Sequence, residues 1–144
     1  MKVLPIEIFL DENVYNVKAF NRTKTAHHNH ALIISDVAYN EVDSVVYIKN
    51  KTNLPTDFVG GRKYSYAIEC LEGSITLEYA SKTSLNRTTA YDDHSDEEHF
   101  EGLGKCVELA ANTIAIFELD EAINYKSIDG SFIEYKIAKD GGIK

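Results

Sequence analysis

The sequence YSYAIECLEGSITLEYA, residues 64–80, decides the fold. Its first half alternates between two kinds of side chain, and Tyr66, Ile68 and Cys70 share one face of an extended strand. This aromatic and apolar face suits the interior of a β-sandwich. Glu72-Gly73 in the middle predicts a tight hairpin turn between two strands.

Short stretches rich in β-branched and aromatic residues recur along the rest of the chain. The expected strands are Val3–Leu10, Ala31–Ser35, Ser44–Lys49, Lys63–Leu71, Ser74–Ala80, Lys105–Leu109, Thr113–Leu119 and Phe132–Ala138. No ten-residue segment combines a helical period with start and stop signals, and only Asp92–Gly102 is expected to hold a turn of helix. This pattern predicts an all-β sandwich, jelly roll or small barrel.

Length and charge narrow the class of protein. The 144 residues predict a single domain over residues 1–144. Fifteen basic against twenty-three acidic residues, a net charge of −8, argue against a nucleic-acid partner. No apolar run approaches the about 20 residues of a membrane helix, and Met1–Ile6 lacks the features of a signal peptide. We therefore expect a cytoplasmic protein with no membrane contact, in which Cys70 and Cys106 are buried and reduced.

Two groups of histidines are candidates for a metal-binding site or a charged site. His27, His28 and His30 could bind zinc, copper or nickel, but residues 21–30 are polar and are interpreted as a surface loop, and a metal site needs ligands from elsewhere in the chain. Both possibilities stay open. His94 and His99 flank an acidic run that we interpret as a solvated face.

Two charged side chains lie on expected strands. Glu78 shares a face with Ser74 and Thr76, and Lys136 shares a face with Glu134. If Glu78 and Lys136 point inward, they must pair with each other or with a ligand, because an isolated buried charge is very costly. The alternative is that both face water.

The segments DFVGGRKY (residues 57–64) and LEGSITLEYA (residues 71–80) resemble the YhcH/YjgK/YiaL family, which includes the beta subunit of the evolved β-galactosidase. The similarity continues through Tyr91-Asp92, Asp96, Phe100–Gly102, Phe117, Leu119-Asp120 and Tyr135–Ile137. It implies a cupin-like β-sandwich, often dimeric, with a role in sugar handling. Sialic acid anomer interconversion and support of a β-galactosidase are the activities that the resemblance implies.

The chain departs from the family pattern at the positions that would hold a metal. Gly61 stands where the family has a histidine, Tyr66 and Ile68 replace an acid and its companion, and Glu121 replaces a late histidine. Only Glu121 is then a plausible metal donor, and a first-row metal needs several convergent donors. We therefore expect no metal and no other cofactor.

The polar residues that survive at the family's positions suit an anionic or hydroxyl-rich ligand. The expected ligand-binding residues are Arg62, Tyr64, Tyr66, Glu78 and Lys136. Glu78, Lys136 and Glu121 are the candidates for acid–base catalysis.

Three interpretations follow from this set, and whether the chain is an enzyme stays open. The first is a metal-free, non-catalytic relative that binds a sugar or other small anionic metabolite, or acts as an accessory subunit of a glycosidase. The second is a metal-independent sugar mutarotase or isomerase. The third is a protein-interaction module whose cavity is filled by Tyr66, Ile68 and their neighbours. A homodimer is compatible with each.

Overall fold

The computed structural model describes residues 1–42 and 44–139. Its helices are α1 (Ile6–Phe9) and α2 (Lys18–His28), with 3-10 turns η1 (His30–Leu32) and η2 (Lys82–Ser84). Its strands are β1 (Lys2–Pro5), β2 (Ala38–Glu41), β3 (Val45–Lys49), β4 (Phe58–Gly60), β5 (Tyr64–Ser81), β6 (Asn86–Arg87), β7 (Glu98–Glu101), β8 (Lys105–Ala110), β9 (Thr113–Ile116) and β10 (Glu121–Ala138).

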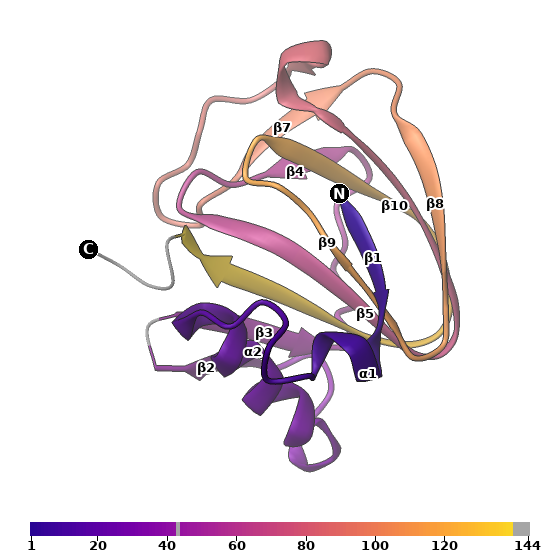
Figure 1. Ribbon diagram of the computed structural model, residues 1–144. Coiled ribbons are helices and arrows are strands. Elements are labelled where there is room, and N and C mark those ends of the chain that lie inside the picture. The colour runs from indigo at the N-terminus through magenta and orange to yellow at the C-terminus, as the bar shows by residue number, and fades with distance from the viewer. Residues whose placement is uncertain (43, 140–144) are drawn as a thin grey trace.

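β5 and β10 hold the fold together, because they pair antiparallel along nearly their whole length and both run through the two layers (Figure 1). In one layer β9 pairs with β5 and β3 pairs with β10. In the other layer β8 pairs with β5 and β4 pairs with β10. β1 and β2 extend the first layer, and β7 and β6 extend the second. The predicted all-β sandwich is confirmed.

The predicted hairpin at Glu72-Gly73 is wrong. Gly73 instead lies opposite Gly130 within the continuous pairing of β5 with β10. Both glycines have positive φ, +75° for Gly73 and +133° for Gly130. A Cβ on Gly73 would lie 1.7 Å from the Asp129 carbonyl oxygen, so the strands bend here only because neither residue has a side chain.

The space between the layers is filled by one apolar cluster. Tyr66, Ile68 and Cys70 contribute to it from β5, which confirms the predicted inward face. From the facing layer come Ile75 and Leu77. Because Tyr66 and Ile68 are buried there, their side chains help to fill the centre of the sandwich.

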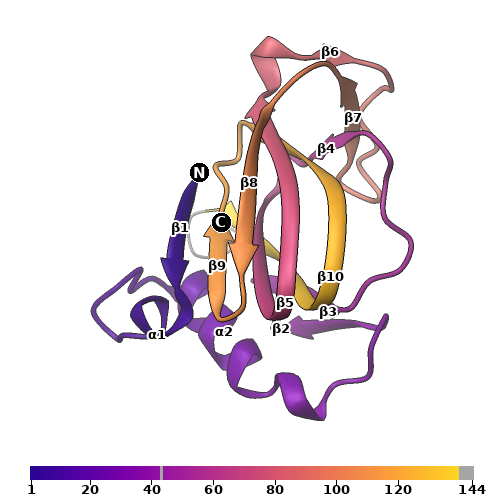
Figure 2. The same cartoon turned by 90° about the vertical axis from the view of Figure 1, so that its right-hand side faces the viewer.

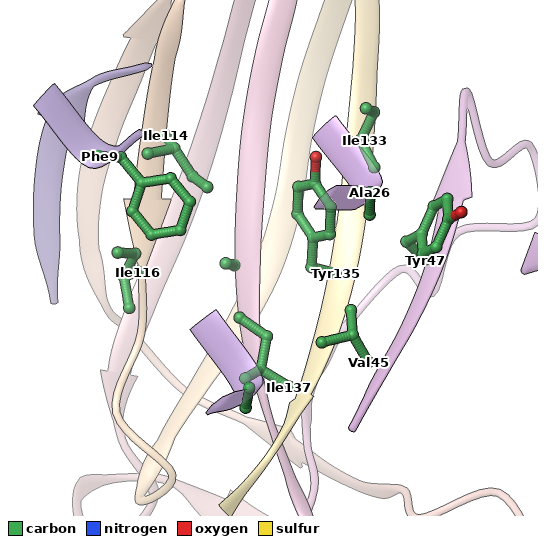
Figure 3. Packing of buried hydrophobic residues seen from close by; sticks show 11 residues of the cluster. Phe9, Ala26, Val45, Tyr47, Ile114, Ile116, Ile133, Tyr135 and Ile137 are labelled. Carbon is green, nitrogen blue, oxygen red and sulfur yellow. The ribbon is translucent and has the colours of Figure 1, made fainter. Parts of the chain in front are cut away.

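A second cluster lies on the outer side of the first layer, under the helices (Figure 2). Figure 3 shows Phe9, Ile114 and Ile116 at one side of this cluster and Tyr135, Val45 and Tyr47 at the other. Ala26 from α2 packs in the same cluster. Residues 66–70 are therefore buried on both faces.

Several local predictions are wrong in the N-terminal third. The polar segment 21–30 is mostly helix α2 and not a loop, and Ala31–Ser35 forms η1 and irregular backbone and not a strand. The expected strand Val3–Leu10 becomes β1 followed by α1. Tertiary packing of Ala19 and Ala26 overrides the weak helical propensity of this sequence.

Two smaller expectations also change. Asp92–Gly102 forms a turn followed by β7, with no helix. Both cysteines are free, but Cys106 is exposed and only Cys70 is buried. No helix within residues 1–42 or 44–139 is both long and apolar enough to cross a bilayer.

Candidate functional site

The end of the sandwich opposite the glycine bend places Lys136 beside Tyr66. The two residues are direct partners in the β10–β5 ladder. The Lys136 ammonium lies 5.6 Å from the centre of the Tyr66 ring, and its side chain is only 20% exposed. Its nearest carboxylate oxygen, Glu97 Oε2, is 3.7 Å away. That distance exceeds a hydrogen bond, so Lys136 has an ion-pair partner but no hydrogen bond to any residue in the described part of the chain.

His99 of β7 reaches the same carboxylate from the other layer. Its neighbour in the ladder is Val59, whose side chain belongs to the interior cluster. The His99 Nδ1 lies 2.8 Å from Asp57 Oδ1, and its Nε2 lies 3.5 Å from Glu97 Oε1. Glu97 therefore lies between Lys136 and His99. We call Tyr66, Glu97, His99 and Lys136 the rim site.

A buried carboxylate lies behind the rim site. Glu134, 3% exposed, accepts hydrogen bonds from the Tyr125 hydroxyl at 3.1 Å and from the Lys51 ammonium at 3.2 Å. Burial raises the pKa of Tyr66 well above its usual value, and the carboxylates of Glu134 and Glu97 raise it further. The phenol of Tyr66 is therefore neutral at physiological pH and can donate a hydrogen bond.

The acidic run is only in part the solvated face that its composition predicts, because residues 92–95 are exposed. Asp96 and Glu98 are buried. Asp96 accepts the backbone N–H groups of Arg62, Lys63 and Tyr64. These contacts close the loop before β5.

Glu98 uses the guanidinium of Arg62 that was expected to bind a ligand. Arg62 donates to both Glu98 oxygens, at 2.8 and 3.1 Å, and lies 4.4 Å from the Tyr91 ring centre. Hydrogen bonding from Arg62 lowers the pKa of Glu98, although burial opposes this. Arg62 therefore has a structural partner in Glu98. Tyr64 is the first residue of β5, two positions before Tyr66.

The structure does not bring Glu78 and Glu121 to Lys136. Leu77 and Tyr79 face the interior, so Glu78 points to the outer side of its layer, where it lies 3.5 Å from Lys126. Glu121 accepts the Glu118 backbone N–H at 2.8 Å and lies 3.1 Å from the Met1 amino group. The pairing of Glu78 with Lys136 considered from sequence does not occur.

The three N-terminal histidines lie at the end of α2 and in η1. His27 Nδ1 is 2.7 Å from Glu69 Oε2, a close contact that is poorly aligned for a hydrogen bond. Burial lowers the pKa of His30, and the neighbouring His27 lowers it further. Within residues 1–42 and 44–139, no three His, Cys, Asp or Glu side chains lie close enough together to hold a metal ion.

Sequence reasoning missed Asp57, Glu97 and His99. The sequence pattern assigns Glu97 and His99 to a solvated charged run. Asp57 occurs there only as the first residue of the DFVGGRKY segment. The one signal in the sequence for a strand here is the apolar Phe100 next to His99. An aromatic residue within a charged run indicates a strand with one buried and one polar face, and Phe100 is buried.

A larger hollow lies away from the rim site. A groove of about 860 Å³ separates the segment around Tyr15 and Phe20 from the ends of β9 and β10, at Phe117 and Ile137. It contains none of the residues expected to bind a ligand. The rim site is therefore distinguished by its charged and aromatic side chains and not by the volume of a hollow.

Comparison with known proteins gives only distant similarities. No family model matches the chain. Protein NMB1881 from Neisseria meningitidis is 11% identical over 82% of this chain and 97% of its own, with a TM-score of 0.41. Hydroquinone 1,2-dioxygenase from Sphingomonas sp. TTNP3, solved with 4-hydroxybenzoate bound, is 9% identical over 85% of this chain and 73% of its own, with a TM-score of 0.48. At these values the similarities carry no argument about activity, and the YhcH/YjgK/YiaL resemblance stays a prediction.

Proposed function

We propose that this protein binds a small molecule bearing hydroxyl and carboxylate groups, such as an acidic sugar, at the rim site and without a metal. The observation that carries the proposal is the Lys136 ammonium. It is mostly buried, lies over an aromatic ring, and has no hydrogen bond to any described residue. A mostly buried ammonium that has a distant ion-pair partner but no hydrogen bond is costly unless an acceptor is supplied.

The neighbours of Lys136 complete a suitable set of groups. Glu97 is held loosely, at 3.5 Å from His99 and 3.7 Å from Lys136. A ligand hydroxyl between these groups can accept from Lys136 and donate to Glu97, with shorter contacts than the protein makes alone. The Tyr66 ring offers an apolar surface beside the ammonium, as small-molecule sites commonly do.

The sugar class follows from the resemblance to the YhcH/YjgK/YiaL family, and the metal-free character follows from Gly61, Tyr66 and Ile68 at the family's ligand positions. We keep a homodimer and an accessory role beside a glycosidase as part of this proposal. Arg62 and Glu78 are left out of the binding set, because Glu98 and Lys126 already pair with them.

The test is a thermal-shift and calorimetric screen with glucuronate, N-acetylneuraminate, glucose and glucose 6-phosphate. A ligand at 100 times its Kd should add about 2.7 kcal/mol of stability. Lys136→Met should weaken binding at least about tenfold, or about 1.4 kcal/mol. Lys126→Met is the matched control, because Lys126 pairs with a carboxylate on the outer face and should leave affinity unchanged.

Two results would contradict the proposal. One is that no compound of this class shifts the melting temperature. The other is that Lys136→Met binds as tightly as the unmodified chain. The first result would leave the protein-interaction module, in agreement with the filled sandwich centre. The second would place the ligand away from the rim site.

A further inference from the structure

We infer that His99, oriented by Asp57, is the base of a proton-transfer reaction on the bound molecule, the abstraction of a proton from the carbon next to a carbonyl group. The inference rests on the proposed small-molecule site. It goes beyond binding by assigning a reaction class to it, and it uses two residues, His99 and Asp57, outside the expected catalytic set.

The first step of the argument is the orientation of the imidazole. Asp57 Oδ1 lies 2.8 Å from Nδ1, so a neutral ring keeps its hydrogen on Nδ1 and its lone pair on Nε2. The carboxylate also stabilises the imidazolium that forms when Nε2 takes up a proton. These are the two tasks of a residue that positions a histidine base.

The second step is that the backbone of His99 is anchored. Its N–H donates to Thr89 Oγ1 at 3.1 Å, and its carbonyl accepts the N–H of Thr88 at 2.8 Å. Pairing with Val59 of β4 fixes the same residue from the other side. The ring is therefore presented from a strand, and rigid elements position reacting groups better than loops do.

The third step is that Nε2 is available. Its nearest acceptor among the described residues is Glu97 Oε1 at 3.5 Å, beyond a good hydrogen bond. The side chain is 24% exposed, so the imidazole is not enclosed by the protein.

The fourth step is a cation placed for the other half of the reaction. The two oxygens of the Glu97 carboxylate face His99 Nε2 and Lys136 Nζ, one each. His99 Nε2 and Lys136 Nζ thus lie on either side of the Glu97 carboxylate. A ligand carbonyl and its neighbouring carbon would take the place of that carboxylate between the two nitrogens. Fixed positive charge at a developing oxyanion is a large contribution to such reactions.

The reaction balances without a further reactant. His99 Nε2 accepts the proton from carbon, and the C–H electron pair forms a carbon–carbon double bond. The carbonyl π pair moves to oxygen, where the Lys136 ammonium stabilises the enolate. The imidazolium then returns its proton to the same carbon, or to the former carbonyl carbon after the hydroxyl proton has moved. The substrate class is an α-hydroxy aldehyde or ketone.

The experiment follows carbon-bound hydrogen exchange by proton NMR in D₂O, with the full chain and with glyceraldehyde, dihydroxyacetone and glucuronate as probes. We expect loss of the α-hydrogen signal of at least one probe above the protein-free rate. His99→Gln should lower that rate about 100-fold or more, the usual contribution of a general base. His94→Gln, at an exposed histidine five positions away, is the matched control and should not change it.

Asp57 requires a different readout, because it acts through His99. Asp57→Asn should lower the exchange rate and move its pH profile, while Asp57→Glu should restore most of the rate. A purely structural role for Asp57 would change the amount of folded protein and leave the profile in place.

The outcomes separate this inference from the function it rests on. Calorimetric binding of a probe without exchange would overturn the inference and leave the binding function standing. Exchange that survives His99→Gln would also overturn it. Absence of both binding and exchange for every probe would overturn the two proposals together.

Discussion

Glu69 brings a carboxylate into the apolar cluster beneath α2. It is 1% exposed, and its Oε1 accepts a hydrogen bond from the Tyr135 hydroxyl at 2.7 Å. His27 Nδ1 contacts the other oxygen at 2.7 Å. The carboxylate thus ties β5, β10 and the end of α2 together. Burial raises the pKa of Tyr135, and Glu69 raises it further, so the phenol stays a donor.

At this residue we expect Glu69→Ala to lower the free energy of unfolding by about 2–4 kcal/mol, because it leaves the Tyr135 hydroxyl buried without a partner and opens a cavity. Glu69→Gln should cost about half as much, since its side-chain oxygen can still accept from Tyr135. Urea denaturation at neutral pH measures both. Glu108→Ala, at an exposed position on β8, is the control. An unchanged midpoint for Glu69→Ala would show that the buried contact contributes nothing.

Single residues were predictable from the sequence where burial follows a strand period. Tyr66 and Ile68 point inward as the alternation predicts. Glu69 and His99 were not predictable, because a polar residue at a buried position is stabilised by partners distant in the sequence. Tyr135 and Asp57 are such partners, and no local pattern identifies them.

At the scale of elements, the bend shared by β5 and β10 illustrates why turn chemistry alone was misleading. Glu72-Gly73 and Asp129-Gly130 are both typical hairpin sequences. Here the positive φ of each glycine serves a bend in a continuing strand. The antiparallel pairing of β5 with β10 continues on both sides, with a register shift between Ser131 and Phe132. A glycine in such a sequence indicates that the backbone needs a positive φ. It does not indicate whether the chain reverses its direction there.

We expect Gly73→Ala and Gly130→Ala each to lower the free energy of unfolding by at least about 2 kcal/mol, from the strained φ and from the overlap with the opposite backbone. In the folded geometry, an added Cβ would meet Asp129 O at 1.7 Å or Glu72 O at 2.0 Å. Thermal and urea denaturation measure the loss. Glu72→Ala, exposed beside Gly73, should be nearly neutral. Equal stabilities for all three variants would contradict a bend that depends on glycine.

The sequence of helix α2 contains one helical pattern, but residues of weak helical propensity surround it. Ala19, Thr23 and Ala26 recur at helical spacing and are all buried. The surrounding Asn, Thr and His residues have weak helical propensity, and no side chain caps the first turn. Packing against the sheet stabilises this helix, so its sequence alone could not identify it.

At the scale of the whole molecule, several buried phenols link stability to high pH. Burial raises the pKa values of Tyr66, Tyr125 and Tyr135 well above the ordinary value of 10.0. The folded state therefore keeps protons that the unfolded state releases above about pH 10. Their contribution to stability is complete below that pH and is lost as the pH rises through the folded-state pKa values.

We therefore expect the free energy of unfolding to fall steeply above about pH 10, by about 1.4 kcal/mol per pH unit for each of the three tyrosines. Denaturation curves combined with tyrosinate absorbance measure this slope. Tyr66→Phe should reduce this slope by about 1.4 kcal/mol per pH unit, because it removes one of the contributing phenols. A stability that stays constant between about pH 9 and about pH 11 would show that these phenols titrate normally.

The continuous pairing of β5 with β10 also has a consequence for how the chain is made. β10 supplies the partner edge for β3, β4 and β5, all of which leave the ribosome long before it does. Until residues 121–138 emerge, those earlier strands expose unpaired backbone and apolar side chains to other nascent chains. Synthesis rate over the last strand thus governs how long this protein is vulnerable to aggregation.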